Sequence, residues 1–336
     1  MAMVSMKDIS SRCHVSVATV SKALNNRGDI SDETKERICQ VAKELGYLPN
    51  SSARALKTNR TYNIGVLFVD KANCGLTHSY FSHVLDSFRR GAEEEGYDIT
   101  FISQHAGKNK LSYYEHSKYR GVDGVVIACV DFEDEAILEL VNSEIPVVTI
   151  DYSFHNKSSI LSDNVTGMEE IVQYVVSMGH RDIAYIHGAD SGVTEHRLRS
   201  FYRTMKDLHV PVRDEWVREG VYHDPESAAR ITNELTLSNR PTCIIYPDDF
   251  ACVGGLNEIE SQGLSVPDDI SVVGYDGQRI SQVIEPRLTT YKQNTEDLGR
   301  LAARKLVEAI EEPKTSLTER LVVQGGLIQG RSVKRL

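Results

Sequence analysis

The chain has 336 residues, of which 40% are hydrophobic and 26% are charged, and its formal net charge is −10. This composition is typical of a soluble globular protein, and the length favours two or three domains over one compact core. No apolar run reaches the roughly 18 residues of a membrane span, and the N-terminus lacks the apolar segment of a signal peptide. The six cysteines form no CxxC pair, so neither a zinc site nor a disulfide framework is indicated. We therefore expect a cytoplasmic protein that contacts no membrane and binds no metal.

The charge is distributed unevenly along the chain. Residues 1–60 contain ten Lys and Arg against six Asp and Glu, a net charge of +4, which leaves −14 for residues 61–336. The acidic total argues against a general polyanion binder. A basic head on an acidic body points instead to a local anionic partner for the head.

Three short helices are predicted in the first 49 residues. The first begins at Ser5, a good N-cap residue, and carries Ile9 on its apolar face. After a tight turn, Ser16 can cap a second helix. The third begins after Ser31, has acidic residues in its first turn and stops at Gly46.

The second of these helices, "VSVATVSKALNN" (residues 15–26), is built from small and mostly uncharged side chains. Val20 and Leu24 share one face and can pack inward, whereas Ala18 and Lys22 lie about 160° away and face outward. Two short helices joined by a tight turn and braced by a third form the helix-turn-helix arrangement, whose second helix enters the DNA major groove. A three-helix domain that contacts another protein is the alternative.

The helix-turn-helix interpretation assigns DNA contacts to the second helix. Val17 and Ala18 can contact thymine methyl groups, and Lys22 can donate to guanine, so these three are the predicted base readers. Phosphate contacts fix the register of a protein on DNA without reading its sequence. The residues predicted to make them are Ser16, Thr19, Ser21 and Asn25.

Residues 50–61 join the head to the rest of the chain and are unusually apolar for a linker. A helix of about eight residues through "SARALK" is too short to be stable alone in water and would form only against a partner. Ala53, Leu56 and Lys57 fit a minor-groove element, in which Leu56 would act as a wedge between base steps.

From residue 62 onward, strand-like and helix-like segments alternate. The strand-like segments are 63–69, 97–103, 124–130, 146–151, 182–188, 242–247 and 270–276. The amphipathic helices between them include 79–95, 133–142, 164–178, 194–208, 249–262 and 294–311. This alternation predicts two parallel sheets, each covered by helices on both faces. Because ligands bind at the carboxyl ends of such strands, the cleft between the two sheets is the expected binding site.

Motifs of common enzyme classes are absent from the sequence. It contains no GxxxxGK[ST] phosphate loop, no GxGxxG after the first strand, no HExxH and no GxSxG. Its 11 histidines are dispersed, without a pair at metal-ligand spacing. We therefore expect no enzyme, no catalytic residue and no cofactor.

The chain resembles a known family over nearly its whole length. "MKDISSRCHVSVATVSKALNNRGDISDETKERICQVAKELGYLPNSSARAL" closely resembles the head of LacI/GalR-type transcriptional regulators, most specifically in "VSVATVSKALN" and "ELGYLPNSSARAL". The likeness continues in "MGHRDIAYIHG", "DISVVGYD", "PRLTTYKQ" and "LGRLAARKL". One departure is His14, which stands where the family usually has Gly and places a larger residue in a left-handed turn.

This resemblance implies the fold class and the assembly. An all-α helix-turn-helix head (1–49) and a hinge helix or linker (50–61) would precede an α/β body (62–336) of two doubly wound parallel-sheet lobes, like a periplasmic sugar-binding protein. The family also binds near-palindromic double-stranded DNA operators as a homodimer, with the paired Leu56 side chains opening the central base step.

The resemblance further implies that the chain crosses between the two lobes three times. One lobe would contain about 62–162 and 292–320, and the other about 163–291 and 321–336. A small effector would bind in the cleft between these lobes.

The effector site carried over from the family has seven residues. They are Phe81, Asp151, Arg199, Tyr222, Asp248, Asp276 and Gln293. Arg199 would anchor the effector and Asp276 would bind its hydroxyl groups, since an Arg fork and Asp carboxylates both suit vicinal hydroxyls. Asp249 is expected instead to cap the helix that follows it. Asp248 falls where many members have Asn or Ser, which leaves the class of effector open.

These features together predict a sequence-specific DNA-binding regulator, a repressor of carbohydrate-utilisation genes controlled by a sugar-like effector. Two alternatives stay open. The same architecture could respond to a nucleobase-type corepressor, or the body could be a solute-binding or enzymatic α/β protein with an incidental helical head.

Overall fold

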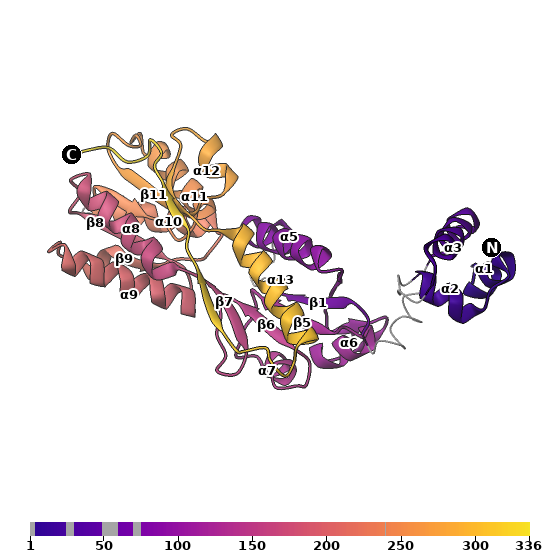
Figure 1. Ribbon diagram of the computed structural model, residues 1–336. Coiled ribbons are helices and arrows are strands. Elements are labelled where there is room, and N and C mark those ends of the chain that lie inside the picture. Colours follow the sequence, from indigo (N-terminus) through magenta and orange to yellow (C-terminus); the bar gives the residue numbers. More distant parts are fainter. Residues whose placement is uncertain (1–3, 25–29, 49–59, 70–74, 239) are drawn as a thin grey trace. The chain divides into compact units, whose positions relative to one another are not determined.

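The computed structural model describes residues 4–24, 30–48, 60–69, 75–238 and 240–336 (Figure 1). The chain divides into two units. We name residues 1–61 the head and residues 62–336 the body.

Three helices make up the described part of the head. They are α1 (Met6–Cys13), α2 (Val17–Leu24) and α3 (Asp32–Leu45). Ile9, Val20 and Ile38, one from each helix, are fully buried in their common core. Leu24 is half-buried against the same core, so the predicted inward face of α2 is confirmed.

The ends of these helices follow the predicted capping chemistry. The Ser5 backbone N–H donates to the Asp8 carboxylate at 2.8 Å, and the Ser31 hydroxyl accepts from a backbone N–H in the first turn of α3. Gly46 ends α3 in the left-handed conformation. His14 adopts the same conformation after α1, with φ of 51°, which confirms the left-handed turn expected at this position.

The first lobe of the body is built on a sheet with the strand order β13-β7-β6-β5-β1-β2, in which neighbouring strands are parallel. Its strands are β1 (Asn63–Phe68), β2 (Asp98–Phe101), β5 (Gly124–Ala128), β6 (Val147–Ile150), β7 (Ser158–Ser162) and β13 (Arg320–Val323). Its helices are α5 (Ser79–Glu94), α6 (Tyr113–Arg120), α7 (Glu135–Val141) and α13 (Thr295–Glu311). A short hairpin of β3 (His105–Ala106) and β4 (Asn109–Lys110) follows β2.

Strand β5 shows why this sheet is covered on both faces. All five of its residues are buried. Val126 packs in a core with α5 and α13, whereas Val125 and Ile127 pack in a core with α6 and α7. Successive side chains of a strand point to opposite faces, so a continuous apolar run requires a helical layer on each side. In Figure 1, α5 and α13 lie side by side over one face.

The second lobe repeats this arrangement with the strand order β14-β12-β11-β10-β8-β9. Its strands are β8 (Ile183–His187), β9 (Val217–Glu219), β10 (Cys243–Ile245), β11 (Ser271–Asp276), β12 (Thr289–Lys292) and β14 (Gly326–Ile328). Its helices are α8 (Asn164–Ser177), α9 (Gly192–Asp207), α10 (Pro225–Ser238), α11 (Asp249–Ser261) and α12 (Arg279–Val283), with η1 (Gly75–Thr77) and η2 (Asp214–Trp216) as single 3₁₀ turns of the body. Helices α8 and α9 cover one face and α10 and α11 the other. Strand β14 is antiparallel to β12.

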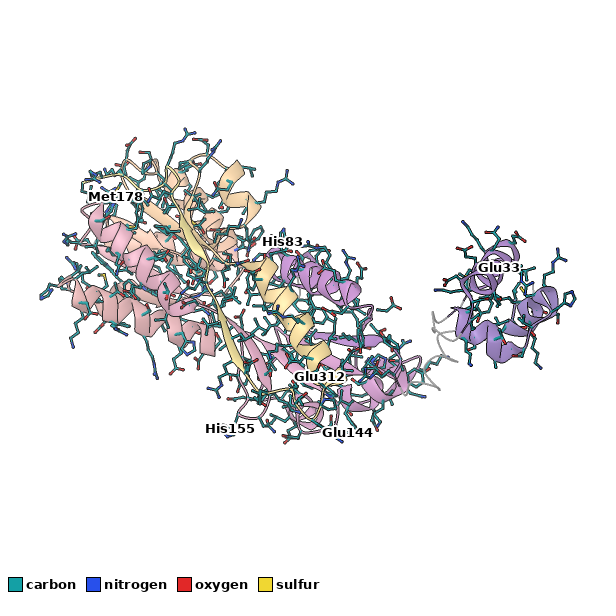
Figure 2. The ribbon with its side chains drawn as sticks, viewed as in Figure 1. Glu33, His83, Glu144, His155, Met178 and Glu312 are labelled. Atoms are coloured by element: carbon teal, nitrogen blue, oxygen red, sulfur yellow. The ribbon has the colours of Figure 1, made fainter. Side chains whose placement is uncertain are left out.

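The chain passes between the lobes after β7, after β12 and after β13. The third passage comes after Val323, because residues 320–323 pair with β7 in the first sheet. The boundary expected at residue 320 is therefore too early. Figure 2 shows the side chains of both lobes, with His83 on α5 of the first and Met178 just after α8 of the second.

The architecture of a helical head and two mainly parallel-sheet lobes confirms the predicted fold class. Within the described ranges, none of the helices combines the length and the apolar character needed to cross a membrane.

Candidate DNA-binding helix and effector site

Helix α2 presents the predicted base readers on its surface. The side chains of Val17, Ala18 and Lys22 are exposed, and Val17 is 40% accessible in the absence of a partner. An apolar side chain on this exposed face is free to contact the methyl groups of a DNA groove.

The hydroxyl groups at the start of α2 are already engaged in capping. The Ser16 hydroxyl accepts from the Thr19 backbone N–H at 3.1 Å and lies 2.9 Å from the Thr19 hydroxyl. Ser16 therefore caps the helix as predicted, and its phosphate contact stays a prediction, like those of Thr19 and Ser21. The remaining predicted DNA contacts, Asn25, Ala53, Leu56 and Lys57, lie outside the described residues.

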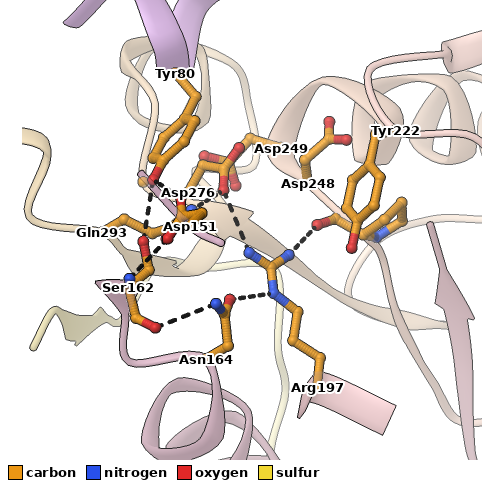
Figure 3. A network of polar contacts seen from close by, with 12 residues as sticks. Tyr80, Asp151, Ser162, Asn164, Arg197, Tyr222, Asp248, Asp249, Asp276 and Gln293 are labelled. Atoms are coloured by element: carbon orange, nitrogen blue, oxygen red, sulfur yellow. Dashed lines mark hydrogen bonds and ion pairs between the residues drawn. The ribbon is translucent and has the colours of Figure 1, made fainter. Parts of the chain in front are cut away.

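In the body, the carboxyl ends of the strands bring polar side chains together between the two lobes (Figure 3). We name the following set the cleft network: Tyr80, Asp151, Ser162, Asn164, Arg197, Pro247, Asp248, Asp249, Asp276, Gln278 and Gln293. Most of its members directly follow a strand, or begin the helix after one, which is where α/β sheets bind ligands.

Arg197, from α9, is the buried centre of this network. Its Nε donates to Asn164 at 2.7 Å and its Nη1 donates to the Pro247 carbonyl at 2.9 Å. The guanidinium lies 3.5 Å from the centroid of the Tyr275 ring, a cation–π contact. Its Nη2 is 4.0 Å from the Asp276 carboxylate, and both side chains are less than a tenth exposed.

Asp276 is held by two amides from neighbouring segments. Gln293 Nε2 donates to Asp276 Oδ1 at 2.6 Å, and Gln278 Nε2 donates to Oδ2 at 3.2 Å. These bonds fix the carboxylate at the end of β11, where it faces Arg197.

The first lobe contributes a second carboxylate, that of Asp151. It accepts from the Tyr80 hydroxyl at 2.9 Å and from the Ser162 backbone N–H at 2.7 Å. Burial raises the pKa of the Tyr80 hydroxyl well above its ordinary value, and the nearby Asp151 raises it further, so this hydroxyl stays protonated and donates.

Of the two acidic residues at the start of α11, Asp248 and not Asp249 is the cap. Asp248 is the N-cap of α11, because its Oδ1 accepts from the Ala251 N–H at 2.8 Å, while its Oδ2 accepts from the His223 N–H at 2.7 Å. Asp249 lies in the first turn, fully buried, and accepts from the Gln278 N–H at 2.6 Å. The prediction that Asp249 caps this helix is therefore wrong.

Burial disfavours the charged form of these carboxyl groups. It raises the pKa of Asp151, Asp248 and Asp249 above the ordinary value for Asp. The neighbouring charge of Asp276 raises the pKa of Asp248 and Asp249 further. The uncharged form of these three carboxyl groups is therefore favoured relative to that of a solvent-exposed Asp.

Several residues of the cleft adopt strained backbone conformations. The φ angles of Asp151, His223 and Asp276 are 57°, 60° and 94°, in the region that normally favours glycine. Strain of this kind persists where the surrounding structure fixes a side chain for binding.

An aromatic column lies beside the cleft network. The imidazole of His223 stacks between the His78 imidazole, 4.3 Å away, and the Phe250 phenyl ring, 4.5 Å away, while Phe81 meets His78 edge-on. A cavity of about 310 Å³ lies next to this column. It is lined by Thr77, Ser79, His223, Phe250, Gln278 and Ile280.

The structure corrects the predicted anchor residue. Arg199 is exposed on α9 and pairs with Glu195 one turn earlier, so the prediction that it faces the cleft is wrong. Arg197 faces the cleft instead, because it shares the buried side of α9 with Thr194 and Phe201. Residues two apart on a helix point about 200° apart, so only one of the two arginines can face inward.

Of the other residues predicted for the effector site, Tyr222 and Phe81 make contacts outside the cleft network. The Tyr222 hydroxyl lies 2.9 Å from that of Thr194, and its ring is 5.8 Å from the Arg197 guanidinium. Phe81 packs against Phe68 and His78 as a wall of the first lobe. Asp151, Asp276 and Gln293 join the cleft network as described above.

Tyr80, Asn164, His78 and His223 were not predicted from the sequence. Tyr80 lies beside Phe81 in "SYF", where the aromatic pair itself was the available signal. No local sequence pattern predicts the stacking of His78 on His223, because the two residues lie far apart in the chain and belong to different lobes.

Comparisons with known proteins agree with this architecture. Residues 5–50 match the bacterial regulatory proteins of the lacI family, and residues 172–333 match the periplasmic binding protein-like domain. The probable HTH-type transcriptional repressor ExuR of Bacillus subtilis (strain 168) is 32% identical, over 99% of this chain and 99% of its own.

Two solved structures share the fold over almost the whole chain. The Lac repressor dimer bound to operator and an anti-inducer has a TM-score of 0.82 and 24% identity, covering 99% of this chain and 100% of that one. The complex of the transcriptional regulator CelR with cellobiose has a TM-score of 0.72 and 23% identity, covering 98% and 99%. The chain therefore belongs to the lacI family of bacterial regulatory proteins: it is a DNA-binding transcriptional repressor and not an enzyme.

Proposed function

We propose that this repressor binds a near-palindromic DNA operator as a homodimer and is controlled by a small sugar-like effector bound between the lobes of the body. The genes it controls are those of carbohydrate utilisation, and it acts in the cytoplasm. The shared fold with a Lac repressor dimer on its operator and with a regulator bound to cellobiose supports this proposal.

Operator recognition is proposed for the exposed face of α2 and the segment that follows the head. Val17, Ala18 and Lys22 read base edges. Ser16, Thr19, Ser21 and Asn25 contact phosphates, and Ala53, Leu56 and Lys57 enter the minor groove. The net charge of +4 on residues 1–60 supplies the attraction to phosphate.

The observation that carries the effector proposal is the gap between Arg197 and Asp276. A separation of 4.0 Å between Nη2 and Oδ1 is too long for a hydrogen bond, although both groups are buried and each is held by other partners. A ligand hydroxyl placed here accepts from the guanidinium and donates to the carboxylate at once. Polyhydroxylated rings offer such groups.

The effector site would also include the predicted Phe81, Asp151, Tyr222, Asp248 and Gln293. Asp151 belongs to the first lobe, whereas Asp276 and Arg197 belong to the second. An effector that contacts both carboxylates binds one lobe arrangement more tightly than others and shifts the population of the DNA-competent state.

A nucleobase-type effector is the second candidate, favoured by the aromatic column. His223 already stacks on two rings at 4.3 and 4.5 Å, the spacing of stacked planar groups. A flat base could replace the His78 ring in this column.

The test begins with selection of duplexes from a random library by the full-length protein. We expect enrichment of near-palindromic sequences whose affinity falls steeply with salt, measured by fluorescence anisotropy. Addition of monosaccharides and, separately, of purine bases then measures the effector response. Failure to enrich any specific duplex would contradict the DNA-binding part, and a response to bases alone would favour the second candidate.

A further inference from the structure

We infer that Asn164 is a positioning residue that ties Arg197 to the first passage of the chain between the lobes, so that movement of the guanidinium is transmitted to this passage. Asn164 is the buried first residue of α8. The inference rests on the proposed function and deepens it, because it names the residue that connects the gap between Arg197 and Asp276 to the angle between the lobes.

The first passage turns on a single residue, Asp163. It lies between Ser162, the last residue of β7, and Asn164. Its φ and ψ angles, −76° and 76°, are neither those of a strand nor those of a helix. Because peptide bonds are rigid, these two angles set the direction in which α8 leaves β7. A change in the angle between the lobes at this passage therefore requires rotation at or next to Asp163.

The side chain of Asn164 spans this turning point. Its Nδ2 donates to the Ser162 carbonyl at 3.2 Å, and its Oδ1 accepts from Arg197 Nε at 2.7 Å (Figure 3). The ring closed by the first bond contains both the φ and the ψ of Asp163, so rotation there strains or breaks this bond. The second bond fixes the amide against the guanidinium. Rotation at the passage and movement of Arg197 are therefore linked.

The two bonds of Asn164 require an amide. A guanidinium only donates and a carbonyl only accepts, whereas the amide carries one acceptor and one donor group in a single plane. A carboxylate in its place would turn an oxygen toward the Ser162 carbonyl oxygen, and an apolar side chain would make neither bond. Because these groups are buried, each lost bond leaves a polar group without its partner.

The first passage is also held from the first lobe. The Ser162 N–H donates to Asp151 Oδ1 at 2.7 Å. The Asp163 N–H donates at 3.0 Å to the carbonyl of Val323, the last residue before the third passage. Movement of Asn164 therefore reaches two of the three passages between the lobes.

The second passage is tied to the other side of the gap. Gln293, which follows β12, donates to Asp276 Oδ1 at 2.6 Å. Arg197 and Asp276, whose nearest charged atoms are 4.0 Å apart, are thus linked to different passages. A ligand that widens or closes this gap acts on the first passage through Asn164 and on the second through Gln293.

The experiment measures this coupling without an effector, by perturbing the gap with Asp276→Asn. A proposed path between two sites has to be shown by coupling and not by proximity alone. Hydrogen exchange with mass spectrometry of the full-length protein follows the Asp163 amide, which reports local opening of the passage. We expect Asp276→Asn to change its exchange rate by about fivefold or more, but by less than about twofold when Asn164→Leu is also present.

A second variant tests the bond to the Ser162 carbonyl and replaces Asn164→Leu if that protein does not fold. Asn164→Asp keeps an oxygen that accepts from Arg197 but loses the donor toward Ser162. It should therefore suppress the response to Asp276→Asn as Asn164→Leu does. A merely structural role would raise the exchange rate in every background and leave the response to Asp276→Asn in place.

The matched control is Asn294→Leu at the second passage. Both side-chain groups of Asn294 bond to Asp297 within the first turn of α13, and neither bonds to the cleft network. In this background, the response of the Asp163 amide to Asp276→Asn should persist at its full size.

Three results would overturn the inference: no response to Asp276→Asn in the wild-type background, an undiminished response in folded Asn164→Leu, or an undiminished response in Asn164→Asp. Binding to the selected operator is measured on the same preparations. If a specific operator is bound and the response survives in Asn164→Leu, the inference alone fails. If no specific operator is bound, the proposed function fails, and the exchange rates still decide whether Asn164 links Arg197 to the passage.

Discussion

The imidazole of His78 lies flat against that of His223, with ring centroids 4.3 Å apart and ring planes inclined by 14°. His78 is the N-cap of α5 in the first lobe, and His223 precedes α10 in the second. The two lobes are therefore joined by a ring-to-ring contact beside the cleft, in addition to the passages of the chain.

Removal of this contact should weaken the arrangement of the lobes seen here. We expect His78→Ala to change effector affinity by up to about tenfold, because a stacked pair contributes roughly 0.5–1.5 kcal/mol. His78→Phe, which keeps a flat ring, should restore most of the effect. His83→Ala, an exposed histidine of the same helix, is the matched control. Titration calorimetry measures all three, and equal affinities for His78→Ala and the wild type would rule out a role for the stack.

Substitutions of the two arginines of α9, Arg197 in the cleft and Arg199 on the surface, test which of them the effector response requires. Arg197→Ala should abolish the effector-induced change in operator affinity, because it leaves the buried Asp276 without its cation. Arg197→Lys keeps the charge but lacks the planar fork, so we expect only partial recovery. Arg199→Ala, which removes an exposed ion pair, should respond like the wild type. Fluorescence anisotropy with and without effector measures the change in operator affinity for each variant. If this change were lost in Arg199→Ala but kept in Arg197→Ala, Arg197 would not be the arginine that binds the effector.

Sequence reading by the head is tested at Lys22. Lys22→Ala should lower affinity for the selected operator by about 1–3 kcal/mol and relax the preference at one position of each half-site. Lys43→Ala, in the last turn of α3, should alter affinity less and leave the preference unchanged. Selection from a randomised operator library reports the preference directly. An unchanged preference in Lys22→Ala would show that this lysine contacts phosphate rather than a base.

The buried carboxyl group of Asp249 predicts a pH-dependent stability. Its pKa is raised by burial above the ordinary value of 3.8, so the folded protein binds this proton more tightly than the unfolded chain does. Stability from this group is thus fully present at low pH and falls as the pH rises above about 4. Asp249→Asn removes the charge and should be more stable than the wild type at pH 7.5, by roughly 1–2 kcal/mol.

Thermal melts of the wild type and Asp249→Asn at pH 4 and pH 7.5 measure how the difference in their stability depends on pH. Most of the advantage of Asp249→Asn should be lost at pH 4, where the wild-type carboxyl is protonated in the folded state and about half of it is protonated in the unfolded state. Asp207→Asn serves as the exposed control and should show no such trend. A variant that is equally destabilised at both pH values would mean that the carboxylate shape, not its charge, matters at this position.

The order of elements and the two-lobed architecture could be predicted because they follow from local patterns. Alternating apolar strands and amphipathic helices identify the sheets, and capping residues such as Ser31 and Gly46 mark helix ends. The core of the head followed in the same way from the spacing of Val20 and Leu24 on α2.

The choice between neighbouring residues of one type could not be made from the sequence. Arg197 and Arg199 differ only in the rotational phase of α9, which begins at Gly192, two residues before the expected start. Asp248 and Asp249 differ only in backbone conformation: the extended φ and ψ of Asp248, −157° and 171°, make it the cap. The His78–His223 contact depends on how two lobes close on each other, which no local pattern encodes.

The parallel pairing of β13 with β7 has a consequence for synthesis of the protein. Residues 320–323 complete a sheet whose first strand begins at residue 63, and β14 completes the other sheet only at residues 326–328. During translation, the head is made before the body, whereas both lobes lack their last strands until synthesis has passed residues 320–323 and 326–328. A chain truncated before β13 can therefore still contain a folded head, but both sheets of its body lack a strand. The proposed regulation by effector, unlike the helical fold of the head, therefore requires a chain that extends through β14.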